Sequence, residues 1–216
     1  MVADFNRDGN PDLLVNEGGF FLVFLGNGDG TFQAPLKYSM NNIESIVAGD
    51  FNGDGIPDLA LTVFSNGGLA ILLGNGDGTF KPGASYMIEP GELLTADLNG
   101  DGNLDLVIYF LPTSQTLTLL GNGDGTFRPP LISHFMTGPT VIGDFNGDGK
   151  LDLATLGSLG AAVALGNGDG TFQAPELYFD IPLGTGALAA GDFNKDGKPD
   201  IAASGNSISI LTNRTK

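Results

Sequence analysis

The hydrophobic and polar positions of the chain follow one pattern, which recurs along its whole length. In residues 46–92, the apolar run IVAGD (46–50) leads into a loop rich in Asp and Gly. The runs DLALTVF (58–64), LAILL (69–73) and TFKPGASYMI (79–88) follow, separated by SNGG and GNGDG. Asn-Gly and Asp-Gly are typical of tight hairpin turns, and no window shows the periodicity of a capped helix. This unit is therefore predicted to form four antiparallel strands.

Two motifs in constant phase mark the repeats of this unit. The Asp-rich loop recurs at intervals of 46 to 48 residues, with its first residue at Asp4, Asp50, Asp97, Asp144 and Asp192. The second motif is LGNGDGTF, which begins at Leu25, Leu73, Leu120 and Leu165 and degenerates to LTNRTK at the C-terminus. Four strands recurring at this period are typical of a β-propeller blade, whereas β-solenoid repeats are usually shorter.

We therefore expect an all-β fold: a single β-propeller domain over residues 1–216, built of about five four-stranded antiparallel blades. The predicted repeats are about 1–45, 46–92, 93–139, 140–187 and 188–216, and the last blade has only three strands. The fourth strands are predicted to be outer edges because they carry proline, at Pro35, Pro82, Pro129 and Pro175. Two interpretations stay open, a five-bladed ring and part of a larger propeller with further blades upstream.

Composition narrows the functions that this fold could serve. The net charge is −16 with only nine Lys and Arg, which argues against nucleic acid or an anionic membrane as a partner. No stretch is long enough to span a membrane, so membrane insertion is not expected. The absence of cysteine excludes disulfides and thiolate metal sites. MVADFNRDG has neither the basic start nor the apolar run of a signal peptide, so any export signal is expected outside this chain.

The acidic residues are concentrated in local sites, since 15 of the 25 lie in the five Asp-rich loops. Numbered from its first residue, each loop has Asp at positions one, five and nine, Asn at three and Gly at six. These side-chain oxygens and the carbonyl of position seven are predicted to bind Ca²⁺ rather than Mg²⁺, although Asp, Asn and Gly are also ordinary turn residues. The predicted ligands are Asp4, Asn6, Asp8, Asn10, Asp12, Asp50, Asn52, Asp54, Ile56, Asp58, Asp97, Asn99, Asp101, Asn103, Asp105, Asp144, Asn146, Asp148, Lys150, Asp152, Asp192, Asn194, Asp196, Lys198 and Asp200.

DFNGDGIPDLAL, LLGNGDGTFKP and their copies resemble the FG-GAP/VCBS repeat, the blade unit of integrin α-subunit propellers and of many secreted bacterial proteins. The resemblance covers essentially the whole chain. It implies a calcium-binding β-propeller outside the cell, secreted or at the cell surface, with one Ca²⁺ per blade and so about five. Propellers of that family typically have seven blades and close by sharing a strand, and neither feature is visible here.

The acidic loops and the GNGDG turns are predicted to lie at the same end of the blades. The connections at the opposite end vary in sequence and carry aromatic residues that are common anchors for sugars or proteins. The candidate ligand-binding residues are Tyr38, Tyr86, Phe135 and Tyr178. The alternative is that these rings pack on the outer strands.

Three functions fit these observations. The first is a calcium-stabilised extracellular recognition or adhesion module for a protein or glycan. The second is a structural propeller without a ligand of its own, and the third is an accessory propeller of a secreted polysaccharide-active enzyme. Catalysis within this chain is not expected, because His134 is the sole histidine and the calcium loops account for most of the Asp residues.

Overall fold

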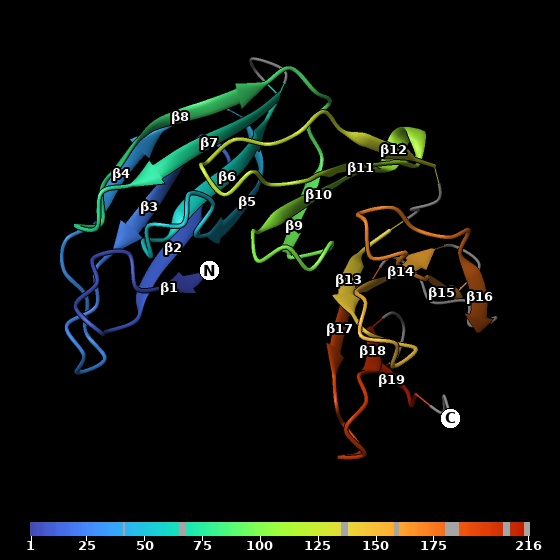
Figure 1. The fold of residues 1–216 in the computed structure, drawn as a ribbon. Coiled ribbons are helices and arrows are strands. Elements are labelled where there is room, and N and C mark those ends of the chain that lie inside the picture. The colour runs from blue at the N-terminus through green and yellow to red at the C-terminus, as the bar shows by residue number, and fades with distance from the viewer. Residues whose placement is uncertain are drawn as a thin grey trace. The chain divides into compact units, whose positions relative to one another are not determined.

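The computed structural model of the chain describes residues 1–40, 42–64, 68–134, 138–157, 160–179, 186–204 and 208–213. Within these residues the secondary structure is β apart from one 3₁₀ turn, η1 (Leu111–Thr113). The strands form five separate antiparallel sheets, each a meander in chain order (Figure 1). The predicted all-β fold of propeller-type blades is thereby confirmed.

Each of the first four sheets has four strands and the fifth has three. Repeat one contains β1 (Val2–Ala3), β2 (Asp12–Asn16), β3 (Phe20–Phe24) and β4 (Leu36–Ser39). Repeat two contains β5 (Ile43–Gly49), β6 (Asp58–Val63), β7 (Gly68–Gly74) and β8 (Phe80–Tyr86). Repeat three contains β9 (Glu92–Ala96), β10 (Asp105–Phe110), β11 (Gln115–Leu119) and β12 (Leu131–Ser133). Repeat four contains β13 (Thr140–Gly143), β14 (Asp152–Gly157), β15 (Gly160–Ala164) and β16 (Glu176–Phe179), and repeat five contains β17 (Leu188–Gly191), β18 (Asp200–Ser204) and β19 (Ile208–Leu211).

The strands occupy the places that their residue types predict. Every residue of β6 is buried, as expected for an inner strand that is apolar on both faces. The fourth strands β4, β8, β12 and β16 are at the edges of their sheets. Pro82 lies within β8, where the pairing with β7 shifts register between Ala70 and Leu72. An edge accommodates this proline because it has no N–H to donate to a ladder.

The chain divides into two compact units. The first contains residues 1–95, 103–108 and 120–129, and the second contains residues 96–102, 109–119 and 130–216. A core in the first unit joins Phe5, Phe21 and Val23 of repeat one to Leu59 and Leu61 of repeat two. In the second unit, Phe145, Ala154 and Val163 of repeat four pack with Ile201 of repeat five. The prediction of one domain over the whole chain stays a prediction.

The phenylalanine that ends each LGNGDGTF motif is called the motif Phe below, and two of these residues join neighbouring repeats. Phe80, the motif Phe of repeat two, packs edge-on against Phe5 of repeat one, with ring centroids 5.7 Å apart. Phe127 of repeat three packs in the same way against Phe51 of repeat two, also at 5.7 Å. Each motif Phe of these two pairs therefore inserts into the repeat that precedes it.

A backbone hydrogen bond accompanies each of these ring contacts. The N–H of Gly78 donates to the carbonyl of Phe5 at 3.1 Å, and the N–H of Gly125 donates to the carbonyl of Phe51 at 2.8 Å. In the degenerate fifth copy, the Nδ2 of Asn213 donates to the carbonyl of Phe145 at 2.7 Å. The carbonyl of position two thus accepts from a side chain in repeat four, whereas it accepts from a glycine N–H in repeats one and two.

Candidate metal loops and ligand-binding residues

The five acidic loops share one hydrogen-bonded conformation. In every loop the N–H of position five donates to one oxygen of the Asp at position one, at 3.0 to 3.2 Å. The N–H of the glycine at position six donates to the other oxygen of that Asp, at 2.8 to 2.9 Å. The glycine adopts a positive φ, +77° at Gly55 and +84° at Gly9, so a residue without Cβ suits this place.

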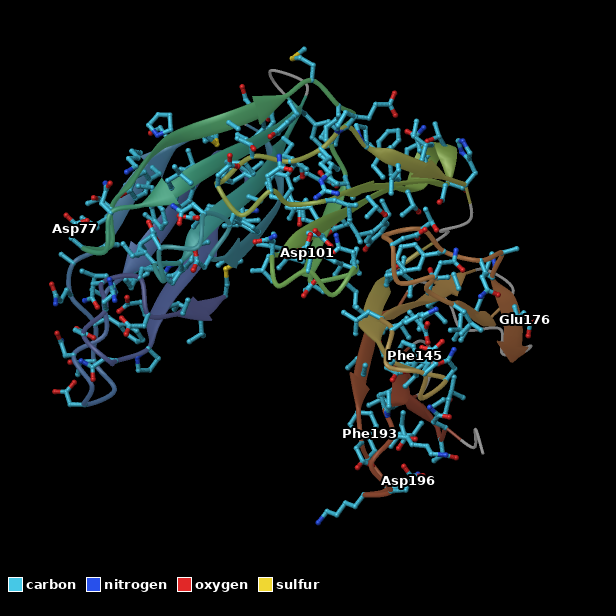
Figure 2. The ribbon with its side chains drawn as sticks, in the orientation of Figure 1. Asp77, Asp101, Phe145, Glu176, Phe193 and Asp196 are labelled. Atoms are coloured by element: carbon cyan, nitrogen blue, oxygen red, sulfur yellow. The ribbon has the colours of Figure 1, made fainter. Side chains whose placement is uncertain are left out.

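The side chains at positions three and five also contact each other. The Asn amide donates to the Asp carboxylate at 2.9 to 3.1 Å, and the Asn oxygen accepts from the N–H of position five. The carboxylates at position five are exposed, and Asp196 lies in the loop beyond the end of β17 (Figure 2). Each loop therefore gathers the oxygens of positions one, three and five near solvent.

Position nine has a different environment, because its carboxylate is buried in all five repeats, with at most 1% of its surface exposed. One oxygen of Asp58 accepts from the N–H of Phe51 at 3.0 Å, and the other accepts from the N–H of Gly74 at 2.8 Å. Asp12, Asp152 and Asp200 make the corresponding pair of bonds. This residue joins the acidic loop to the end of the third strand. It was predicted from the sequence only as a metal ligand. Its recurrence at position nine in every loop, directly before an apolar strand, is the available signal for the joining role.

Glycine begins the GNGDG turn because the acidic loop lies against it. A Cβ at Gly74 would be 2.4 Å from the carbonyl oxygen of Pro57, and the equivalent atoms at Gly26, Gly121 and Gly166 would be equally close. The predicted placement of the acidic loop and the GNGDG turn at one end of the blade is thereby confirmed within each of these repeats.

Hydrogen bonding and burial shift the acidic pKa values in opposite directions. Burial raises the pKa of Asp58 and of Asp152 at position nine. A backbone hydrogen bond from position seven lowers the pKa of Asp8 and of Asp148 at position five. Asp8 and Asp148 therefore stay ionised to lower pH than an ordinary carboxylate, which suits a cation ligand.

The fit of a metal ion to these loops depends on the oxygen atoms that their side chains and backbone offer. Within the described residues, no group of three or more His, Cys, Asp or Glu side chains is placed to hold a metal ion. Each loop instead offers two carboxylates, an amide oxygen and a backbone carbonyl, which is the hard-oxygen set that Ca²⁺ accepts. A carboxylate oxygen that accepts one N–H retains a second lone pair for an ion. The donor chemistry of the loops therefore fits Ca²⁺.

The candidate ligand-binding aromatics have packing roles where the structure describes them. Tyr38 is half-buried and stacks on Phe21, with ring centroids 4.7 Å apart. The hydroxyl of Tyr86 accepts the N–H of Phe127 at 2.7 Å. Phe135 and the side chain of Tyr178, which is in β16, lie outside the described residues. Tyr38 and Tyr86 thus make packing contacts on the blade, and the prediction that they bind a ligand stays a prediction.

Two exposed apolar side chains were missed at the end of repeat two opposite its acidic loop. Phe64 follows β6 and is 51% exposed, and Met87 follows β8 and is 85% exposed. Both lie in connections at that end of the blade. The variation in sequence between these connections was the signal that could have identified the two residues. These two residues offer apolar surface for a ligand.

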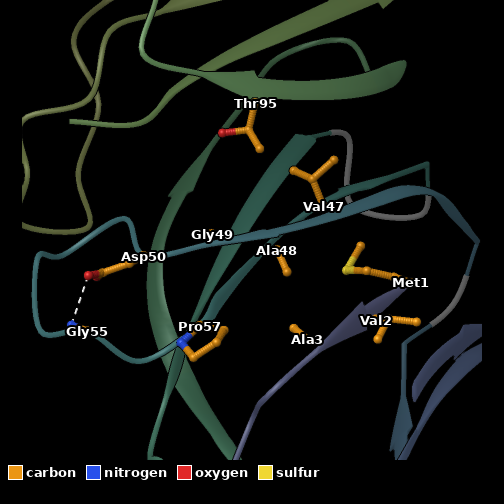
Figure 3. A pocket seen from close by; sticks show the side chains of 10 residues that line it. All are labelled: Met1, Val2, Ala3, Val47, Ala48, Gly49, Asp50, Gly55, Pro57 and Thr95. Carbon is orange, nitrogen blue, oxygen red and sulfur yellow. Dashed lines mark hydrogen bonds between the residues drawn. The ribbon is translucent and has the colours of Figure 1, made fainter. Parts of the chain in front are cut away.

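A hollow of about 440 Å³ lies beside the second acidic loop in the first unit (Figure 3). It is lined by Met1, Val2 and Ala3 near β1, by Val47 and neighbouring residues of β5, and by Thr95 of β9. The carboxylate of Asp50 is bonded to the N–H of Gly55, and the rest of the lining is largely apolar. Asp50 is the one acidic residue among those that line the hollow.

No described helix is long and apolar enough to cross a membrane. The sole histidine, His134, is exposed. Meandering sheets, each with an acidic loop joined to a hairpin turn by a buried aspartate, define a repeat protein of the β-propeller class.

The chain belongs to the FG-GAP-like repeat family, which matches residues 4–61, 50–108, 97–155 and 144–203. No curated protein matches its sequence. Among solved structures, it is similar to an Agrocybe aegerita lectin described as specifically recognising non-reducing terminal N-acetylglucosamine, with 23% identity and a TM-score of 0.69. It is also similar to the Tc holotoxin pore of Photorhabdus luminescens, with 18% identity and a TM-score of 0.58. The chain is covered over 100% and 97% of its length, and it spans 66% of the lectin chain and 11% of the toxin chain.

Proposed function

We propose that this chain is a calcium-stabilised recognition module that acts outside the cell and binds a glycan or protein partner. The observation that carries the calcium part is the one conformation shared by five acidic loops. In each loop an ion would be held by the oxygens of positions one, three and five and by the carbonyl of position seven. The additional prediction that position nine coordinates the ion stays a prediction.

The proposed location follows from the chemistry of these loops. They lack the bidentate Glu of a high-affinity EF-hand, so we expect dissociation constants of about 10⁻⁴ to 10⁻³ M, the range of extracellular calcium modules. Such loops would be empty at cytosolic calcium concentrations. Isothermal titration calorimetry tests this expectation, and a sub-micromolar dissociation constant would contradict the extracellular assignment.

The fold shared with a lectin supports a glycan as the partner of first choice, because lectin-like recognition is known on this architecture. The proposed contact surface is the end of each blade opposite the acidic loops. Phe64 and Met87 are exposed there, and an apolar side chain can pack against the face of a sugar ring.

A glycan array probed with the purified chain tests this function, with N-acetylglucosamine-terminated glycans included and with calcium or chelator in parallel. We expect calcium-dependent binding that Phe64→Ala or Met87→Ala weakens at least severalfold. Ile132→Ala is a matched control, because Ile132 is 58% exposed on the edge strand β12. Equal weakening by the control would remove the proposed surface. No binding by a folded, calcium-loaded chain would favour a structural propeller instead.

A further inference from the structure

The Asn at position three is followed by glycine in the acidic loops of repeats two, three and four. These pairs are Asn52-Gly53, Asn99-Gly100 and Asn146-Gly147, whereas the loops of repeats one and five have Asn6-Arg7 and Asn194-Lys195. Arg7 and Lys195 adopt a positive φ, 60° and 64°, as the three glycines do at 71° to 78°. The same loop conformation therefore holds two kinds of neighbour after the Asn.

In the loops of repeats two, three and four, a carboxylate accepts the N–H of this glycine. The N–H of Gly53 donates to an oxygen of Asp50 at 2.8 Å, and the corresponding distances in repeats three and four are 2.8 and 2.7 Å. A carboxylate in this place can take the proton of the N–H and so make the glycine nitrogen a nucleophile. Among the described residues, Asp4 and Asp192 accept from positions five and six but not from position four.

The side-chain amide of the same Asn is held at both of its polar atoms. The Oδ1 of Asn52 accepts the N–H of Asp54 at 2.9 Å, and its Nδ2 donates to the Asp54 carboxylate at 3.0 Å. The first bond would stabilise the negative charge that develops on Oδ1 when a nucleophile attacks Cγ. The same two bonds recur at Asn99 and Asn146. Each of these loops thus places a base, a nucleophile and an electrophile on neighbouring residues.

We propose that Asn52, Asn99 and Asn146 convert spontaneously to aspartate and isoaspartate. The glycine nitrogen bonds to Cγ of the Asn as the Cγ–Nδ2 bond breaks, and Nδ2 leaves as ammonia with the proton that the glycine N–H has lost. The cyclic imide that results then adds water, which opens it at either carbonyl. Opening at Cγ gives aspartate, and opening at the main-chain carbonyl gives isoaspartate, in which the backbone runs through the side chain.

This conversion would change each loop permanently. Water reaches the reacting atoms, because the glycine at position four is exposed in all three repeats. Conversion to aspartate adds a carboxylate to the oxygens that we propose as Ca²⁺ ligands, whereas isoaspartate lengthens the main chain and so disrupts the bonds to position one. A bound ion would hold the same Asp and Asn oxygens, so calcium should slow the conversion. Only this last expectation rests on the proposed function.

The GNGDG turns contain further Asn-Gly pairs, which provide a comparison within the same chain. They begin at Asn27, Asn75, Asn122 and Asn167, all of which are exposed, whereas the Asn at position three of the loops is half-buried. The turn Asn donates to a Thr hydroxyl at 2.8 to 2.9 Å, and among the described residues the glycine N–H that follows it donates to no carboxylate. Exposure alone would favour conversion in the turns, whereas the hydrogen bonds favour it in the loops.

The test is peptide mass spectrometry of the whole chain after incubation in chelator, with the two products separated by chromatography. We expect the three loop pairs to convert at least severalfold faster than the turn pairs, and Asn6 and Asn194 to remain unconverted. In urea the loop and turn pairs should convert at one common rate, because the hydrogen bonds are lost. No conversion in the loops, or equal rates in the loops and turns of the folded chain, would overturn the proposal.

Asp50→Asn tests the part played by the carboxylate, because it keeps an acceptor oxygen that cannot take the proton. Conversion at Asn52 should fall severalfold, while Asn99 and Asn146 in the same molecules are matched controls and keep their rates. Those two rates also report folding, since the unfolded chain loses the difference between loops and turns. Asp97→Asn, followed at Asn99, replaces Asp50→Asn if that variant misfolds. An undiminished rate at the altered loop of a folded variant would refute the proposed mechanism.

A parallel incubation in calcium separates this proposal from the proposed calcium binding. Slower conversion in the loops, with unchanged conversion in the turns, would support both. Equal conversion in the loops with calcium and with chelator would count against calcium binding there and would leave the conversion itself established.

Discussion

The motif predicts a metal ligand at position nine, but the aspartate there makes hydrogen bonds that hold two parts of the repeat together. Asp58 is fully buried and accepts two backbone N–H groups from segments 23 residues apart, Phe51 and Gly74. The sequence showed the Asp and its fixed spacing but not its partners. Those partners are main-chain atoms, which carry no sequence signal, so only the folded repeat reveals them.

Replacing Asp58 by Asn should destabilise the fold by about 1–3 kcal/mol, because the amide has one acceptor oxygen for two buried donors. Urea unfolding in chelator measures the change. Asp54→Asn, at an exposed position of the same loop, is the control and should leave the unfolding free energy nearly unchanged. Equal losses in the two variants would argue against the joining role.

The hydrogen bonds of the GNGDG turns predict that the aspartate in such a turn contributes to stability in a way that depends on pH. The side chain of Thr79 donates to Asp77 and lowers its pKa below the usual 3.8. Because the folded-state pKa is depressed, the stability from this carboxylate is present above the unfolded pKa and is lost as pH falls through the folded one. Carbon-13 titration of the Asp77 carboxyl should give a midpoint below 3.8. Thr79→Val should raise that midpoint, and an unchanged midpoint would contradict the assignment.

At the scale of strands and turns, the sequence predicted most of the structure. Its apolar runs locate β6 and β7 to within a residue or two, and proline marks the edge strands. The sequence did not predict which repeat each motif Phe contacts, because the copies of the motif are nearly identical in sequence. Phe80 packs on Phe5 of repeat one, whereas Phe32 is 46% exposed, and nothing in the two copies of the motif signals that difference.

Identical substitutions at these two positions should therefore have different effects. Phe80→Ala removes a partly buried ring that contacts Phe5, Phe21 and Tyr38. Loss of a fully buried ring costs about 3–5 kcal/mol, so we expect a smaller loss here that still exceeds about 1 kcal/mol. Phe32→Ala should cost less than about 1 kcal/mol, since surface substitutions have small effects. Thermal and urea unfolding of the two variants measure the difference. Similar losses would contradict the proposed packing.

For the whole molecule, the dominant quantity is the net charge of −16. The five acidic loops hold 15 of the 25 acidic side chains. Five Ca²⁺ would bring ten positive charges to the places where the carboxylates are concentrated. Ion binding to the folded loops stabilises the native state by mass action. The overall charge therefore makes the stability of the chain dependent on its ionic surroundings.

Removing calcium should lower the melting temperature markedly. At a free calcium concentration ten times the dissociation constant, each occupied loop adds about 1.4 kcal/mol to the unfolding free energy. A change of 1 kcal/mol moves the Tm of a chain of this size by about 2–4 °C. Differential scanning calorimetry with calcium and with chelator measures the shift. A melting curve indifferent to chelator would refute calcium binding at these loops.

The main-chain carbonyls that accept the hydrogen bonds between repeats have a consequence for how such repeat proteins evolve. No substitution at Phe5 or Phe51 can delete the accepting atom, and Asn213 shows that a side chain can supply the donor when the glycine turn is lost. A duplicated repeat thus arrives with both halves of its joint already made. Gene duplication and deletion can lengthen or shorten the array by whole repeats without any compensating point mutation.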